Sequence, residues 1–172
     1  MGGGSWSSST YNAFSKSVST APRAAVFKSR VIKDDYNPKN ITRRESLITA
    51  EHPNPTPIVV AFDVTGSMGG IPEAFVKTLL GDLMDTLTDS GAVTDPQVCI
   101  CAVGDAFSDA APLQISHFES DNRVSTHLAD IYLEGGGGGT CHESYEGAWD
   151  WCAQDSNLSL ECLKQGRKGI FF

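Results

Sequence analysis

The sequence predicts an open α/β fold, in which a mostly parallel sheet carries helices on both faces. Two short apolar runs, residues 58–62 and 98–103, are rich in β-branched residues and show no polar alternation. Such runs are typical of strands that are buried on both sides, as in a parallel sheet. Between them, apolar residues recur at steps of three and four from Phe75 to Leu87, which is the spacing of an amphipathic helix. Strand, helix and strand in this order indicate a parallel pair joined by a crossover.

Three segments of different composition divide the chain of 172 residues, a length that suits one domain. Residues 1–50 are expected to form a basic, partly flexible N-terminal extension, and residues 1–22, rich in Gly, Ser and Thr, are expected to be an extended or flexible arm. Residues 51–57 contain three prolines, which block regular structure, and are predicted to be a linker. Residues 58–172 then form the folded domain.

The remaining elements follow from turn signals and apolar patterns. The first helix begins near Pro72, which suits a first helical turn, and ends before Ser90-Gly91. A third strand at 113–118 follows the second after a loop too short for a parallel crossover, so this strand is expected to be antiparallel. The later elements are helices over 122–133 and 145–152 and a fourth strand at 169–172.

The predicted strand order across the sheet is 3-2-1-4, which places the fourth strand at an edge. Residues 169–172 are apolar apart from the glycine. Uncovered apolar edge strands promote aggregation. We therefore expect either that the domain is incomplete at its C-terminal end or that an oligomer contact or a second chain covers this strand.

Charge is unevenly distributed along the chain. Residues 1–50 contain eight Lys/Arg and three Asp/Glu, a net charge of +5, and residues 51–172 contain five and eighteen, a net charge of −13. The acidic body disfavours nucleic acid as a partner, because phosphate binding needs Lys and Arg. The basic extension is expected to lie on the acidic body or on a neighbouring subunit, with an anionic partner as the third alternative.

The sequence contains no apolar run long enough to cross a membrane and no apolar core of a secretion signal. These absences predict a cytoplasmic protein without a membrane partner. The five cysteines fit this, because an odd number cannot form a complete set of disulfides. We expect reduced, buried thiols, with Cys99 and Cys101 on the same side of their strand. A zinc site at Cys141 and His142 is a lesser alternative, because the ligand spacing is wrong.

Oxygen-bearing side chains alternate directly after the first strand, in the segment Asp63-Val64-Thr65-Gly66-Ser67. In open α/β sheets, ligands bind at the carboxyl ends of strands. Alternate residues of an extended loop point the same way, so Asp63, Thr65 and Ser67 can offer one carboxylate and two hydroxyls to one point. Such hard oxygen donors suit Mg²⁺, which prefers octahedral coordination and keeps several waters.

This segment resembles the metal-ion-dependent adhesion site (MIDAS) of von Willebrand factor A-type (VWA) domains, whose motif D-x-S-x-S it matches with Thr65 in place of the first serine. The resemblance covers about residues 57–172 and implies a Rossmann-like sheet. The family adds a threonine from a later loop, and Thr140, after the glycine run, looks like its counterpart. The family also adds an Asp after the next strand, before which this sequence ends. Asp105, at the end of the second strand, is expected to replace that Asp or to lie in the metal's outer coordination shell.

The resemblance implies a binding module and no enzyme activity. In such a site the protein leaves one metal position open, and an Asp or Glu of a protein partner fills it. The ion is expected to be Mg²⁺, with Mn²⁺ or Ca²⁺ as substitutes, and neutral hydroxyl ligands leave it electrophilic. Family members often work with AAA+ ATPases, so such an ATPase is a further expected partner.

Two other function classes stay open. The chain could be a structural assembly subunit with the same fold and no metal, in which Thr65 and Ser67 cap the following helix. It could instead be a serine hydrolase, because residues 65–69 miss the G-x-S-x-G motif at one position. Ser67 would then be the nucleophile. Its partners would be an acid, Asp105 or Asp109, and a histidine, His117, His127 or His142.

Overall fold

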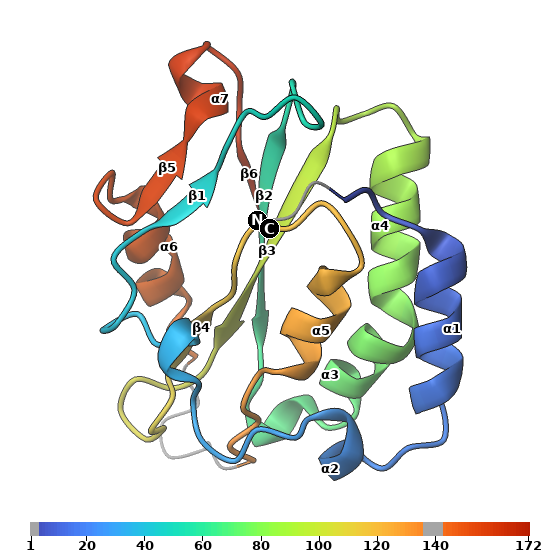
Figure 1. Ribbon diagram of the computed structural model, residues 1–172. Helices are drawn as coiled ribbons and strands as arrows, with labels where there is room; N and C mark the ends of the chain where they lie inside the picture. The colour runs from blue at the N-terminus through green and yellow to red at the C-terminus, as the bar shows by residue number, and fades with distance from the viewer. Residues whose placement is uncertain (1–3, 136–142) are drawn as a thin grey trace.

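A four-stranded open sheet forms the centre of the protein in the computed structural model, which describes residues 4–135 and 143–172. Its strands, in the spatial order β4-β3-β2-β6, are β4 (Leu113–Ile115), β3 (Pro96–Val103), β2 (Thr56–Asp63) and β6 (Ile170–Phe171). β3 and β6 pair with β2 in parallel, whereas β4 pairs with β3 in antiparallel orientation. The predicted strand order and the single antiparallel strand of this sheet are therefore confirmed (Figure 1).

Helices cover both faces of this sheet (Figure 1). One face carries α3 (Ile71–Ala74), a π-helical turn η3 (Phe75–Leu79) and α4 (Leu80–Asp89), which follow one another without a break, together with α5 (Arg123–Ala129) and the outer helix α1 (Ser8–Val18). The other face carries α6 (Tyr145–Ala153) and a separate parallel pair of strands, β1 (Arg44–Ser46) and β5 (Leu158–Leu160), with α7 (Glu161–Lys164) after it. Short turns of helix, α2 (Arg23–Val26), η1 (Asp34–Tyr36) and η2 (Gly66–Met68), lie in the connections.

Both faces of β2 and β3 are buried, as their continuous apolar sequences predict. Ile58 and Ile100 belong to the hydrophobic cluster that includes the residues of α1, α4 and α5. Val59, Cys99 and Cys101 belong to the cluster on the opposite face, which includes residues of α6. The two cysteines thus face the same side, as predicted, and both are free thiols.

The expectation of an extended or flexible arm is wrong for residues 8–18, which form α1. The Ser7 side chain begins this helix by accepting a hydrogen bond from the Thr10 N–H at 3.3 Å. Tyr11 is buried, and its hydroxyl donates to the carbonyl of Val76 at 2.8 Å. A side chain at Gly81 would collide with the Tyr11 ring, so glycine there permits close packing of α1 on α4. Tertiary contacts therefore order a segment of low apolar content.

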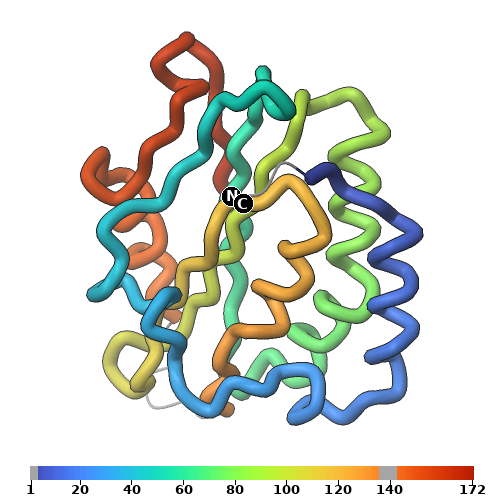
Figure 2. The backbone as a smooth tube through the Cα atoms, in the orientation of Figure 1, coloured from blue at the N-terminus to red at the C-terminus, as the bar shows by residue number. Residues whose placement is uncertain are grey.

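The basic extension lies on the acidic body, which is the first of the placements predicted for it. Figure 2 shows the blue segment after α1 running along the edge at which β2 and β3 end and then turning up beside β4 toward β1. Arg23 forms an ion pair with Glu73 at the start of the long helix. Lys33 pairs with Asp130, just after α5, at 2.7 Å. Opposite charges therefore hold the extension in place, although partly exposed pairs of this kind stabilise a fold only modestly.

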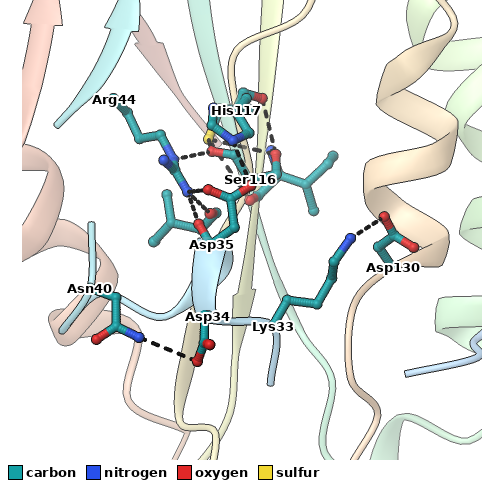
Figure 3. A network of polar contacts seen from close by, with 11 residues as sticks. Lys33, Asp34, Asp35, Asn40, Arg44, Ser116, His117 and Asp130 are labelled. Atoms are coloured by element: carbon teal, nitrogen blue, oxygen red, sulfur yellow. Dashed lines mark hydrogen bonds and ion pairs between the residues drawn. The ribbon is translucent and has the colours of Figure 1, made fainter. Parts of the chain in front are cut away.

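Arg44 fastens the end of this extension to the chain around β4 (Figure 3). Its buried guanidinium donates to the carbonyls of Ile115 and Ser116, both at 2.9 Å, and to the carbonyl of Asp35. The Asp35 carboxylate also meets His117 Nε2 at 2.8 Å. Burial alone would raise the pKa of Asp35, but the hydrogen bond and charge of His117, with Arg44 and Lys33, outweigh it and lower that pKa. Arg44 is therefore a structural clamp.

Several element bounds differ from those predicted. β4 ends at Ile115, and only an isolated bridge between Val98 and Glu119 continues the strand predicted over 113–118. α5 ends at Ala129, four residues earlier than predicted, and β2 begins at Thr56, inside the predicted linker. β1 and β5 were not predicted at all, because strands of three residues are too short to show an apolar period.

In the part of the chain that the structure describes, no helix combines the length and the apolar character that crossing a membrane requires. The cysteines of this part are free thiols, as expected, and each is buried or half-buried. Burial raises the pKa of Cys152 to about 11 and that of Cys99 to about 12, so both thiols are inert at neutral pH. The alternative zinc site at Cys141 and His142 lies outside the described residues.

Candidate functional site

The loop after β2 brings three predicted site residues together. Asp63 is the last residue of β2, and its carboxylate Oδ1 accepts a hydrogen bond from the Thr65 N–H at 2.6 Å. This bond folds the chain into a tight turn that starts at the end of the strand. Thr65 Oγ1 and Ser67 Oγ then lie 2.9 Å apart and share a hydrogen bond. Asp63, Thr65 and Ser67 therefore lie close together as predicted, but in a tight turn and the 3₁₀ turn η2 and not in the extended loop that the alternating pattern predicts.

The two hydroxyl oxygens are spaced as neighbouring ligands of a small divalent cation. Ligand oxygens about 2.1 Å from Mg²⁺ at right angles to each other are about 3.0 Å apart. The 2.9 Å between Thr65 Oγ1 and Ser67 Oγ matches that spacing. Asp63 and Thr65 are buried, whereas Ser67 is exposed. The donor set is therefore packed against the protein on one side and open to solvent on the other. Asp63, Thr65 and Ser67 are therefore the residues that could hold a metal ion here.

The interpretation of Thr65 and Ser67 as helix caps is wrong. Thr65 is the N-cap residue of η2, and its side chain makes no capping hydrogen bond. Gly70 is the N-cap of α3, so the helix that follows begins without a side-chain cap at that position. The hydroxyls of Thr65 and Ser67 are instead hydrogen-bonded to each other. Capping therefore does not explain why hydroxyl residues occupy this turn.

Asp105 lies on the same edge of the sheet as Asp63. The register pairs Asp63 with Val103, and Asp105 follows two residues later. Its carboxylate accepts hydrogen bonds from the Phe107 N–H at 2.8 Å and from the Ser108 hydroxyl at 2.9 Å. Asp105 is therefore a turn-forming residue, and it is buried. Its role toward a metal stays a prediction.

The segment that leads into α6 meets the same edge. The Ser144 N–H donates to the Gly104 carbonyl at 3.0 Å, and Ser144 Oγ accepts from the Ala106 N–H at 3.0 Å. Tyr145, the next residue, comes close to Asp63: burial raises the pKa of its phenol, and the Asp63 carboxylate adds to that effect. Thr140, the predicted ligand from the glycine-rich loop, lies outside the described residues.

Two neighbours of this loop were not predicted. Arg23 Nη2 donates to the Gly69 carbonyl while its Nε pairs with Glu73, so the N-terminal extension reaches the turn itself. Tyr145 was expected only as the first residue of the helix over 145–152. The sequence indicates the contact of Arg23 only through the opposite net charges of the extension and the body. That difference does not show which basic residue of the extension reaches the loop. For Tyr145 the signal is its place just after the glycine run, where a helix begins.

Within residues 4–135 and 143–172, no group of three or more His, Cys, Asp or Glu side chains is placed to hold a metal ion. The loop after β2 has another composition, with one carboxylate and two hydroxyls. Such a set supplies hard oxygens and little negative charge, which suits Mg²⁺ better than Zn²⁺. The chemistry that this arrangement offers is therefore the binding of an oxygen-preferring cation.

The arrangement expected of a hydrolase based on Ser67 is not formed by the described histidines. Ser67 Oγ is bonded to Thr65 Oγ1. His117 pairs with Asp35 and packs beside His127, whose ring lies edge-on to Tyr36. His142 lies outside the described residues. Ser67 thus has no contact with a histidine among the residues that the structure describes.

Comparisons of the chain with protein-family models, with curated proteins and with solved structures found no match. The chemistry of the loop after β2 is therefore inferred from its own geometry.

Proposed function

We propose that this protein is a binding module that holds Mg²⁺, or Mn²⁺ or Ca²⁺ in its place, at Asp63, Thr65 and Ser67 and binds an acidic residue of a protein partner through that ion. The observation that carries the proposal is the 2.9 Å separation of the Thr65 and Ser67 hydroxyl oxygens beside the Asp63 carboxylate. This is the donor set and spacing of one side of an octahedral site. Its position at the carboxyl end of a central strand is where open α/β sheets bind ligands.

The chemistry of these donors favours a partner carboxylate. Asp63 contributes one negative charge and the hydroxyls contribute none, so a divalent ion here keeps a net positive charge. Ser67 is exposed, so the ion's outer side can be reached by another molecule. The resemblance of residues 63–67 to the VWA adhesion motif supports the same mode of binding. On this proposal, Asp105, on the same edge of the sheet, binds a water ligand of the ion.

A thermal denaturation series tests the metal. We expect Mg²⁺ at about ten times its Kd to raise the free energy of unfolding by about 1.4 kcal/mol and the Tm by about 3–6 °C. Asp63→Asn should abolish this shift, because it removes the charge but keeps an oxygen that can accept from the Thr65 N–H. Asp82→Asn, at an exposed position of α4, is the matched control and should leave the shift unchanged. A Tm that does not respond to Mg²⁺, Mn²⁺ or Ca²⁺ would contradict the proposal.

The carboxylate step can be measured separately. A short peptide with one Asp should bind the Mg²⁺-loaded protein, and the matching Asn peptide should not, because an amide carries no charge to complete the ion's coordination. EDTA should abolish binding of the Asp peptide. Metal binding without any difference between the two peptides would leave a metal site but overturn the adhesion function. The identity of a natural partner, such as an AAA+ ATPase, is a further prediction.

A further inference from the structure

A second group of polar side chains lies at the amino ends of β2 and β3, the opposite end of the sheet from Asp63. His52 precedes β2, Asp95 precedes β3, and Ser120 follows β4. His52 Nδ1 is hydrogen-bonded to the Asp95 carboxylate, and His52 Nε2 lies 2.9 Å from Ser120 Oγ. Hydroxyl, imidazole and carboxylate thus contact one another in series. This is the arrangement that activates a serine for nucleophilic attack.

We propose that Ser120, His52 and Asp95 form a latent esterase site for short-chain acyl esters, which the segment around Gly4 covers in this structure. The proposal is independent of the metal site at the other end of the sheet. It assigns Ser120 as nucleophile, His52 as general base and acid, and Asp95 as the residue that positions His52.

The base and its positioning residue are held firmly. His52 is 5% exposed, and its backbone N–H donates to Thr49 Oγ1 at 3.0 Å. Asp95 adopts a φ of 52°, in the left-handed region that residues other than glycine rarely occupy, and its carbonyl accepts from the Thr56 N–H at 3.0 Å. The Asp95 Oδ2 atom is buried and has no hydrogen-bond partner in the described part of the chain. The other carboxylate oxygen, Oδ1, is hydrogen-bonded to His52 Nδ1 and so fixes the orientation of the imidazole ring.

Gly4 explains why the site is latent. Its carbonyl accepts a hydrogen bond from Ser120 Oγ at 2.6 Å and lies 3.0 Å from His52 Nε2. Because a carbonyl can only accept, the Ser120 proton points to Gly4, and His52 Nε2 contacts Ser120 Oγ and the Gly4 carbonyl as a donor. Once Gly4 moves away, the Nε2–H tautomer loses its carbonyl acceptor, and a deprotonated Nε2 is the nearest acceptor for the Ser120 proton. The bond from Nδ1–H to Asp95 then selects the tautomer whose Nε2 lone pair is free.

A small cavity next to these residues limits the substrate. It has a volume of about 230 Å³ and is lined by His52, Asp95, Ser120, Trp6, Val93 and Thr88, among others. This is below the range of pockets that hold drug-sized ligands. The cavity therefore has room for a short acyl chain, and the apolar faces of Trp6 and Val93 suit its methyl and methylene groups.

The reaction needs only an ester and water. Ser120 Oγ attacks the ester carbonyl carbon while its proton passes to His52 Nε2, and the alcohol leaves with that proton as the ester C–O bond breaks. A water molecule then attacks the acyl-serine, giving its proton to His52. The bond between the acyl carbon and Ser120 Oγ breaks, Ser120 takes the proton back, and a carboxylic acid is released.

Displacing Gly4 in the full chain tests the proposal. Gly4→Val should push the segment away, because a Cβ at this position collides with the Asp121 side chain, which Arg123 holds by two hydrogen bonds of 2.9 Å. We expect hydrolysis of p-nitrophenyl acetate and labelling by a fluorophosphonate probe to rise about tenfold or more over the unsubstituted protein. Peptide mapping should place the label on Ser120. If Gly4→Val does not fold, Trp6→Ala is used in its place. It removes the hydrogen bond of 2.7 Å from the indole N–H to the Asp85 carboxylate and so loosens the same segment.

Three second substitutions in the Gly4→Val background make the test specific. Adding Ser120→Ala should abolish the label and the hydrolysis, and adding His52→Gln should reduce both about a hundredfold. Adding Ser156→Ala, at an exposed serine outside both sites, is the matched control and should change neither. A folded protein whose Ser120 stays unlabelled after the segment is loosened would overturn the proposal and leave a purely structural cluster. Equal labelling with and without His52 would overturn it too.

Discussion

The two ends of the central sheet carry polar side chains in opposite settings. At the carboxyl end, near α3 in Figure 1, Asp63, Thr65 and Ser67 come from one turn of chain, and Ser67 faces solvent. At the amino end, His52 and Ser120 come from separate loops and are almost fully buried beneath Gly4. On our two proposals, the open end binds its ligand as it stands, whereas the covered end needs Gly4 to move first. Exposure, more than residue type, therefore distinguishes the two proposed sites.

The same contrast predicts how each end contributes to stability. Buried hydrogen bonds and charges contribute more to the free energy of unfolding than exposed ones, because a lost partner leaves a polar group without water. Substitutions at the covered end should therefore destabilise the protein, and substitutions at the open end should chiefly affect binding.

The largest effect is expected in the core that supports both ends. Ile100 is completely buried in the middle of β3, and Ile100→Ala should lower the free energy of unfolding by about 2–5 kcal/mol through lost burial and a cavity. Urea denaturation measures this. Val31→Ala, at a side chain that is 70% exposed, is the control and should change stability by less than about 0.5 kcal/mol. Similar losses in the two variants would contradict the described core.

The covered end should come next. His52→Leu removes the hydrogen-bond partner of the mostly buried Asp95 carboxylate and should cost about 2–3 kcal/mol. Replacing Asp95 as well, by His52→Leu with Asp95→Leu, should recover part of the loss, because no charge is then left buried. Thermal or urea denaturation of both variants gives the comparison. A double variant no more stable than His52→Leu alone would contradict the pairing.

A smaller loss of stability is expected on acidification, and it arises from a histidine at neither end of the central sheet. Burial, with the charge of His117, lowers the pKa of His127 on α5 to about 4. Below the unfolded-state pKa of about 6.5, the unfolded chain takes up a proton that the folded protein does not. The free energy of unfolding therefore decreases as the pH is lowered, and this decrease levels off near pH 4. Between pH 7 and pH 5 this should amount to roughly 1–2 kcal/mol, allowing for partial exposure. His127→Gln should remove that part of the pH dependence, and an unchanged slope would count against it.

The smallest effect on stability is expected at the open end. Ser67→Ala removes one exposed hydroxyl and should change the free energy of unfolding by less than about 0.5 kcal/mol. The Tm shift caused by Mg²⁺ should nevertheless be lost or strongly reduced, because a direct ligand is missing. Differential scanning fluorimetry with and without Mg²⁺ measures both quantities. A variant that unfolds easily but keeps its response to Mg²⁺ would reverse the comparison between the two ends.

The open end could be predicted from the sequence because its information is local. Asp63, Thr65 and Ser67 are alternate residues after a recognisable strand, so their proximity follows from chain geometry. The covered end could not be predicted in this way. His52 and Asp95 are 43 positions apart and His52 and Ser120 are 68 apart, and only the pairing of β2, β3 and β4 brings their loops together.

The N-terminal helix shows the same limit. Tyr11, Phe14 and Val18 follow helical spacing, but serine and threonine around them favour an irregular arm. What orders α1 is the surface of α4, where Gly81 leaves room for the Tyr11 ring. Three-residue strands such as β1 and β5 likewise depend on a partner and not on their own pattern.

The sequence by itself determined the buried strands β2 and β3, the antiparallel pairing of the third predicted strand with the second, and the cluster of oxygen donors after β2. Each of these depends on contacts or connections between residues close in the chain, and hydrophobic period and loop length report them directly. Only the tertiary structure decided where the N-terminal extension lies and which histidine meets a serine and a carboxylate. Those outcomes depend on packing between distant segments, whose free energy no local pattern records.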